Sequence, residues 1–183
     1  MTLTKSKFRQ KCLKKLRKRP KHNKLYKDYL VNRELLQVLQ KQKKQNILLY
    51  YPLENEVDIR KIFKKLRKKH NVFLPFMVSK SFKMVPFRLP LKRKKFGILE
   101  AGNTLRNIKK IDIAVVPVVG VDGNLQRIGF GKGMYDRFFE KLLNKPYTIF
   151  IQSELCYTKE KICDAYDITG DIVITPKKII KRK

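Results

Sequence analysis

The sequence predicts a single α/β domain, and three observations support this. Short apolar runs rich in Val and Ile, typical of buried strands, alternate along the chain with amphipathic helical segments, which is the pattern of an α/β sheet. The length of 183 residues suffices for one substantial core, whereas two smaller domains would each be marginal. The hydrophobic content of 43%, with eleven Phe and eight Tyr, excludes a disordered basic tail. We therefore expect residues 1–183 to form one domain.

The first half of the chain predicts three helices and three strands. Helices are expected over residues 4–19, 25–44 and 59–69, where apolar side chains recur at helical spacing, and Pro20 ends the first of them. The side chains of the second helix that are expected to face the core are Leu25, Tyr29, Leu35, Leu36 and Leu39. Strands are expected at 46–51, 71–77 and 84–89, the last two as an antiparallel hairpin.

The second half is organised around residues 111–139. A β-branched run from 111 to 121 predicts a buried strand that kinks or ends near Pro117 and Gly120. A turn at residues 122–124 follows, then a loop with glycines at alternate positions, then an amphipathic helix that begins at Tyr135. Two further strands are expected at 147–152 and 171–175.

A glycine-rich loop between a buried strand and a helix favours anions. Backbone without side chains can approach a phosphate closely, and the helix start offers unpaired N–H groups with partial positive charge. Arg127 and Lys132 add positive charge here, and Asp136 supplies a hard oxygen ligand of the kind that Mg²⁺ shares with substrate phosphates. The loop fits neither the Walker pattern nor the dinucleotide fingerprint. These residues predict a nucleotide and magnesium site; the alternative is that the glycines only make a tight turn.

Two further groups of charged residues are candidates for binding. Lys5 and Arg9 are four residues apart, so on a helix both cations share a face and can converge on one anionic group; a solvated basic face is the alternative. Glu54, Glu56 and Asp58 follow a predicted strand, at the edge where open α/β sheets bind ligands. Glu56 or Asp58 could equally cap the next helix, and the sequence alone supports both interpretations.

The net charge of +30, with a pI near 10.2, raises the alternative of a nucleic-acid-binding protein. Against a specific binding face, lysine predominates over arginine and the lysines spread along the whole chain. Acidic residues are almost absent before position 50 but reappear at Glu56, Asp136 and Asp167, where a metal-nucleotide enzyme needs them. We therefore expect no specific nucleic-acid partner and only non-specific adhesion to polyanions.

The cysteines and apolar runs predict the compartment. Cys12, Cys156 and Cys163 form no CxxC pair and suggest neither a zinc site nor a disulfide framework, so free thiols in a reducing cytoplasm are expected. His22 and His70 have no ligand-like neighbours and are expected at the surface. The longest apolar run is too short to span a bilayer, and no membrane partner is expected.

Several motifs together resemble those of the 5-formyltetrahydrofolate cyclo-ligase family. They extend over nearly the whole chain: KSKFR, YYPLENEVD, FLP, FGILEAG, VPVVGVDGNLQRIGFGKGMYDRF and YDITGDIVIT. The central motif is the most specific, since it is similar to the family signature RLGxGxGYYDR. The chain departs from the family pattern at three positions: Ile128 replaces leucine, Met134 replaces the first tyrosine, and Ala101 stands where proline is common. The change at Ala101 is expected to alter loop rigidity more than chemistry.

The resemblance implies a three-layer α/β/α domain with a mixed, mostly parallel sheet. It also implies ring closure of 5-formyltetrahydrofolate to 5,10-methenyltetrahydrofolate with ATP as co-substrate and Mg²⁺ as cofactor, by a protein expected to be a monomer. The implied catalytic residues are Arg127, Lys132 and Tyr135; the implied ATP contacts are Lys5, Arg9, Arg127, Gly129, Gly131, Lys132, Gly133 and Tyr135; the implied folate contacts are Glu56, Tyr51, Phe130 and Met134; the implied metal ligands are Asp136 and Asp167. Asp164 and Asp171 remain alternatives to Asp167.

Overall fold

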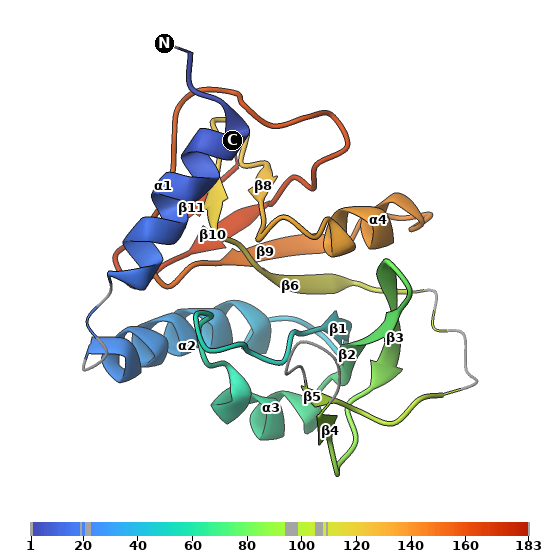
Figure 1. Ribbon diagram of the computed structural model, residues 1–183. Helices are drawn as coiled ribbons and strands as arrows, with labels where there is room; N and C mark the ends of the chain where they lie inside the picture. The colour runs from blue at the N-terminus through green and yellow to red at the C-terminus, as the bar shows by residue number, and fades with distance from the viewer. Residues whose placement is uncertain are drawn as a thin grey trace.

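A seven-stranded mixed sheet lies at the centre of the molecule, with helices on both faces (Figure 1). The computed structural model describes residues 2–18, 20, 23–93, 99–104, 108 and 110–182. The helices are α1 (Lys5–Arg17), α2 (Lys24–Gln40), α3 (Arg60–Arg67) and α4 (Met134–Glu140). The strands are β1 (Asn46–Leu48), β2 (Asn71–Val78), β3 (Ser81–Pro86), β4 (Lys92–Arg93), β5 (Leu99–Glu100), β6 (Ile113–Pro117), β7 (Gly120–Val121), β8 (Arg127–Ile128), β9 (Tyr147–Ile151), β10 (Ile172–Ile174) and β11 (Ile179–Lys181).

The strand order β11-β10-β9-β6-β1-β2-β3 confirms the predicted mixed, mostly parallel sheet. The five inner strands are parallel, and the two edge strands, β3 and β11, are antiparallel to their neighbours. The predicted hairpin forms between β2 and β3. The run expected as one strand is divided into β6 and β7 after Pro117, as its proline and glycine indicated, and β7 pairs with β8 as a separate ribbon.

The alternation of side chains along the inner strands produces the two outer layers. In β6, Ile113 and Val115 belong to the apolar cluster that α2 and α3 cover, whereas Ala114 and Val116 belong to the cluster that α4 covers. Because successive side chains of a strand point to opposite faces, a continuous apolar run is buried on both sides. The three-layer arrangement follows directly.

Helix α1 packs apart from these two clusters, against the β7–β8 ribbon. Phe8, Cys12 and Leu16 form a third apolar cluster with Val119 and Ile128. The ribbon accommodates the helix closely, because a Cβ atom built at Gly120 would lie 3.0 Å from both Cys12 Sγ and the Phe8 ring. This packing fixes the position of the helix face that carries Lys5 and Arg9.

The structure corrects two expectations about apolar residues. Cys12 and Cys156 form a disulfide, so they are not free thiols, whereas Cys163 is free as expected. In α2, Leu25 and Tyr29 are 75% and 59% exposed. The buried face of this helix follows a different stripe, made of Asp28, Val31, Asn32, Leu35 and Leu39.

The imidazole of His70 is not at the surface. Only 4% of the residue is exposed, and its Nδ1 accepts a hydrogen bond from the backbone N–H of Gln45. His22 lies outside the described residues. None of the described helices is both long enough and apolar enough to cross a membrane.

Candidate functional site

A polar cavity of about 410 Å³ opens between α1, the glycine loop and the start of α4. Its lining residues are Lys5, Arg9, Arg127, Gly129, Gly131, Gly133, Asp136, Arg137, Glu140, Tyr166 and Asp167. Among them four cations outnumber the three carboxylates of Asp136, Glu140 and Asp167, and three glycines leave the backbone accessible. Such a surface suits an anionic ligand.

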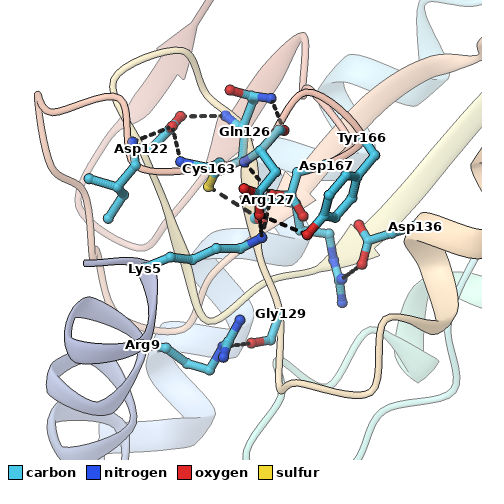
Figure 2. A network of polar contacts seen from close by, with 12 residues as sticks. Lys5, Arg9, Asp122, Gln126, Arg127, Gly129, Asp136, Cys163, Tyr166 and Asp167 are labelled. Atoms are coloured by element: carbon cyan, nitrogen blue, oxygen red, sulfur yellow. Dashed lines mark hydrogen bonds and ion pairs between the residues drawn. The ribbon is translucent and has the colours of Figure 1, made fainter.

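Arg127 lies at the centre of the site (Figure 2). Only 6% of Arg127 is exposed, and its Nη1 donates a hydrogen bond to Asp136 Oδ2 at 3.2 Å. The guanidinium carbon lies 5.0 Å from the centre of the Tyr135 ring. Arg127 Nε and Asp136 Oδ1 are both buried without a hydrogen-bond partner among the described residues. A buried ion pair with unused donor and acceptor capacity can bind a further charged group.

The glycine loop owes its shape to close contacts and to positive φ angles. A Cβ atom at Gly129 would lie 2.4 Å from Arg127 Nη1, so only glycine leaves room for the guanidinium. Gly131 and Gly133 have φ angles of +104° and +60°, which favour glycine over residues with side chains. Arg9 Nε donates to the carbonyl oxygen of Gly129 at 3.0 Å, which joins α1 to the loop.

Lys5 joins α1 to the segment before β10. Its ammonium contacts Asp167 and lies 3.0 Å from Asp164 Oδ2 and 5.4 Å from the centre of the Tyr166 ring. Burial opposes the charged form, but the hydrogen bonds and charges of Asp167 and Asp164 outweigh it and raise the pKa of Lys5. The predicted pair Lys5 and Arg9 therefore faces the cavity, not open solvent.

Asp122, interpreted from sequence as a turn residue, fixes this acidic segment in place. Its fully buried Oδ2 accepts backbone N–H bonds from Ile162 and Cys163, each at 3.1 Å. Gln126 Nε2 adds a bond to the carbonyl oxygen of Asp164 at 2.8 Å. The β7–β8 turn thus sets the position of Asp167 relative to Arg127 (Figure 2).

An apolar cavity of about 300 Å³ adjoins the polar one and shares Arg127 and Gly133 with it. Its lining residues are Tyr50, Tyr51, Leu53, Glu56, Pro75, Met77, Phe82, Leu99, Pro117, Arg127, Phe130, Lys132, Gly133, Met134 and Tyr135. A mostly apolar cavity with a few polar groups is typical of a site for an organic molecule. Arg127 is the charged residue that both cavities share.

Glu56 is the carboxylate of the apolar cavity. Burial raises the pKa of Glu56 to about 7. Two effects oppose this rise: the Leu53 backbone N–H donates to Oε2 at 2.8 Å, and the positive charge of Arg127 lies nearby. Asp58 instead bonds the backbone N–H of Arg60 at 3.0 Å, in the first turn of α3. The sequence alone could not decide whether Glu56 or Asp58 caps the next helix. In the structure Asp58 contacts the start of α3, and Glu56 faces the apolar cavity.

The residues expected to contact ATP, folate or metal each line one of the two cavities, whereas the other candidates, Glu54, Asp58, Asp164 and Asp171, line neither. The expected nucleotide contacts lie in the polar cavity, except that Lys132 and Tyr135 line the apolar one, with the expected folate contacts. Sequence reasoning missed Arg137, Glu140 and Tyr166 in the polar cavity, and it missed the hairpin residues Pro75, Met77 and Phe82 in the apolar one. The hairpin carries no sequence signal for binding, because its apolar residues are typical of any buried strand.

The two expected metal ligands, Asp136 and Asp167, both line the polar cavity. Across the described ranges, no group of three or more His, Cys, Asp or Glu side chains is placed to hold a metal ion. Mg²⁺ does not require such a group, because it is commonly bound by one or two carboxylates together with substrate phosphates and water. The unpartnered Oδ1 of Asp136 fits this mode of binding.

The protein is of the α/β class, with a cavity rich in cations and glycines next to a mostly apolar one. The model of the 5-formyltetrahydrofolate cyclo-ligase family matches residues 1–176, and the chain therefore belongs to that family.

Curated relatives and solved structures agree with this assignment. The chain is 32% identical over 164 residues to the 5-formyltetrahydrofolate cyclo-ligase of Mycoplasma genitalium, covering 87% of this chain and 92% of the relative. It is 28% identical over 141 residues to that of Haemophilus influenzae, covering 72% and 74%. The structure of Aquifex aeolicus 5,10-methenyltetrahydrofolate synthetase superposes with a TM-score of 0.81 at 26% identity, covering 98% of this chain and 93% of that one. The Mycoplasma pneumoniae synthetase, at 24% identity and a TM-score of 0.72 over 95% and 99%, shares the fold.

Proposed function

We propose that this protein converts 5-formyltetrahydrofolate to 5,10-methenyltetrahydrofolate with ATP and Mg²⁺, releasing ADP and phosphate. The family match and the names of the relatives support the reaction. The observation that carries the assignment of sites is the position of Arg127, which lines both the cation-rich cavity and the apolar one. A residue shared by both cavities can contact the phosphoryl group as it passes from one substrate to the other.

The chemistry requires activation of a poor leaving group. The formyl oxygen attacks the γ-phosphorus of ATP, and the bond from that phosphorus to ADP breaks. N10 then attacks the formyl carbon and loses its proton, while phosphate leaves with the former formyl oxygen. Phosphoryl transfer depends on positioning and charge neutralisation more than on covalent help from the protein. A site of cations, glycine backbone and carboxylates meets this need.

The candidate residues divide into roles according to the cavity that they line. In this proposal Lys5, Arg9 and the backbone of the glycine loop hold the phosphates, and Arg127 and Lys132 stabilise charge on the transferring phosphoryl group. Tyr135 lies against the guanidinium of Arg127 and orients it. Folate occupies the apolar cavity between Tyr51, Glu56, Phe130 and Met134. When bound, Mg²⁺ would be held by Asp136, with Asp167 as the second carboxylate, and would neutralise phosphate charge.

One assay tests the reaction. Protein, ATP, Mg²⁺ and 5-formyltetrahydrofolate are mixed, and the methenyl chromophore is followed in the near ultraviolet. We expect absorbance to rise only when all components are present, with one ADP released per methenyl group. No absorbance change at high protein concentration would overturn the proposed function.

The metal role of Asp136 has its own test. We expect Asp136→Asn to raise the Mg²⁺ concentration for half-maximal activity by about tenfold or more, because a neutral amide oxygen is a weaker ligand than a carboxylate. The measurement is an Mg²⁺ titration of the initial rate. Asp58→Asn is the control, since Asp58 pairs with Arg60 and lines neither cavity. Near-wild-type turnover of Asp136→Asn at limiting Mg²⁺ would show that the metal role is wrong.

The raised pKa of Glu56 predicts a pH dependence of stability. A carboxyl group with a folded-state pKa of about 7, above the usual 4.5, binds more protons in the folded than in the unfolded state between these values. The contribution of Glu56 to the free energy of unfolding therefore falls as pH rises from 4.5 to 7. We expect the free energy of unfolding of Glu56→Gln, measured by urea denaturation, to exceed that of the wild type by about 3 kcal/mol at pH 8 and to differ little at pH 4.5.

The same substitution tests the folate site. We expect the pH profile of kcat/KM for 5-formyltetrahydrofolate to inflect near pH 7 in the wild type and to lose that inflection in Glu56→Gln. Glu54→Gln is the matched control, because Glu54 is exposed in the same turn. Equal urea midpoints for Glu56→Gln and Glu54→Gln at pH 8 would contradict the burial of a charged Glu56.

The remaining expectations belong to the same proposal. We propose that the protein acts as a monomer in the cytoplasm, although the Cys12–Cys156 disulfide removes the support that free thiols gave to this compartment. We also propose that its charge of +30 gives only non-specific adhesion to polyanions. A salt gradient on a heparin column tests the last point, because retention well above physiological ionic strength would indicate a specific binding face.

A further inference from the structure

We propose that Arg137 is a positioning residue that makes binding in the nucleotide cavity and binding in the folate cavity depend on each other. The inference rests on the proposed function, since it takes the two cavities as the sites of ATP and 5-formyltetrahydrofolate. Arg137 itself lines the polar cavity. Its side chain donates hydrogen bonds to the backbone of two segments that carry residues of the apolar cavity.

The first segment is the glycine loop. Arg137 Nη2 donates to the carbonyl oxygen of Lys132 at 2.5 Å. The guanidinium reaches this oxygen because Gly133 has no side chain, since a Cβ atom there would lie 2.9 Å from Arg137 Nη1. Lys132 and Gly133 line the apolar cavity, and Gly133 also lines the polar one. The bond therefore holds the part of the loop where the two cavities meet.

The second segment is the tip of the β2–β3 hairpin. Arg137 Nε and Nη2 donate to the carbonyl oxygen of Lys80 at 2.8 and 2.5 Å. Lys80 follows Ser79, which has a positive φ of 51°, in the two-residue turn that joins the strands. Met77 and Phe82, on either side of this turn, line the apolar cavity. Figure 1 shows the tip of this hairpin beside α4, the helix that carries Arg137.

The shape of the guanidinium makes one side chain sufficient for both segments. Its planar fork presents several N–H groups in fixed directions, so it can bond the Lys80 and Lys132 carbonyl oxygens at once. A lysine at this position would offer a single nitrogen at the end of a flexible chain. A ligand in the polar cavity that orders Arg137 thereby orders both walls of the apolar cavity, and linkage requires the converse to hold equally.

The test measures coupling between the two ligands in wild-type protein and in Arg137→Lys. Affinity for 5-formyltetrahydrofolate is determined by calorimetry with and without a non-hydrolysable ATP analogue and Mg²⁺. In the wild type we expect the analogue to tighten folate binding by about fivefold or more. In Arg137→Lys we expect this coupling factor to fall close to one. The factor, not the affinity for either ligand alone, is the readout, because Arg137 lines the polar cavity and its bonds hold two segments beside the apolar one. Arg33→Lys is the control, because Arg33 pairs with Glu34 at the surface, and its coupling should equal that of the wild type.

Two results would overturn the inference, and each can be told apart from failure of the proposed function. They are the absence of coupling in the wild type and undiminished coupling in folded Arg137→Lys. A purely structural role would lower the affinity for each ligand without changing the coupling factor, and would therefore give the second result. Arg137→Gln, with near-ultraviolet circular dichroism as a check of folding, provides a second variant. Failure of the proposed function would appear instead as a wild-type protein that binds neither ligand and forms no methenyl product.

Discussion

Replacing Arg127 with methionine is expected to lower kcat by about a thousandfold or more, because donors aimed at the transferring phosphoryl group supply a large share of the catalysis of such reactions. Arg127 is buried, lines both cavities and sits against Asp136 and Tyr135. Methionine fills a similar volume without the charge. The measurement is the rate of the methenyl assay at saturating ATP and folate.

The loss of Arg127 also leaves the carboxylate of Asp136 without its ion-pair partner, and this effect must be separated from catalysis. We expect Arg127→Met to lose stability as well as activity, since an unpaired charge in a partly buried site is unfavourable. The double variant Arg127→Met, Asp136→Asn should regain stability but not activity. Arg33→Met is the control for loss of a surface arginine. A kcat within tenfold of the wild type in folded Arg127→Met would exclude the proposed role.

Reduction of the Cys12–Cys156 disulfide is expected to lower the free energy of unfolding by about 2–5 kcal/mol. The two cysteines are 144 residues apart in sequence, so the bond closes a long loop and strongly restricts the unfolded chain. It also anchors α1 one turn from Arg9, so reduction should raise the KM for ATP. Urea unfolding with and without dithiothreitol measures the first effect, and initial rates measure the second.

Cysteine variants provide the controls for this prediction. Protein purified without reductant and then denatured should show one reactive thiol, that of Cys163. Cys163→Ser should respond to reductant as the wild type does, whereas the Cys12→Ala, Cys156→Ala double variant should not respond. Three reactive thiols, together with a urea midpoint that reductant leaves unchanged, would contradict the disulfide.

Most of the fold could be predicted from the sequence because the inner strands are buried on both faces. Such strands appear as continuous apolar runs, as at residues 46–51 and 147–152, and the structure contains a strand within each. The prediction was wrong for Leu25 and Tyr29, because the polar residues Asp28 and Asn32 occupy the buried face of α2. Asn32 is buried because its Nδ2 bonds the carbonyl oxygens of Asp28 and Asp58, a tertiary contact that helical spacing does not reveal.

The candidate site was predictable where the chemistry lies within one short segment. Arg127, the glycines and Asp136 lie within ten residues, and all of them line the polar cavity. The disulfide was not predictable, because 144 residues separate its cysteines and only the docking of α1 on the ribbon brings them together. Arg137 was missed for a similar reason, since its hydrogen bonds go to backbone carbonyl oxygens, which carry no residue-specific signal.

The packing of α1 has a consequence for how the protein is made. The helix leaves the ribosome before its apolar partners Val119, Ile128 and Cys156, which are translated much later. At roughly 5–20 residues per second, the 144 residues between Cys12 and Cys156 take on the order of ten to thirty seconds to synthesise. During that interval Phe8 and Leu16 lack the cluster that covers them in the folded protein. The nascent helix is therefore a basic amphipathic segment with an uncovered apolar stripe, and its docking is a late step that completes the polar cavity.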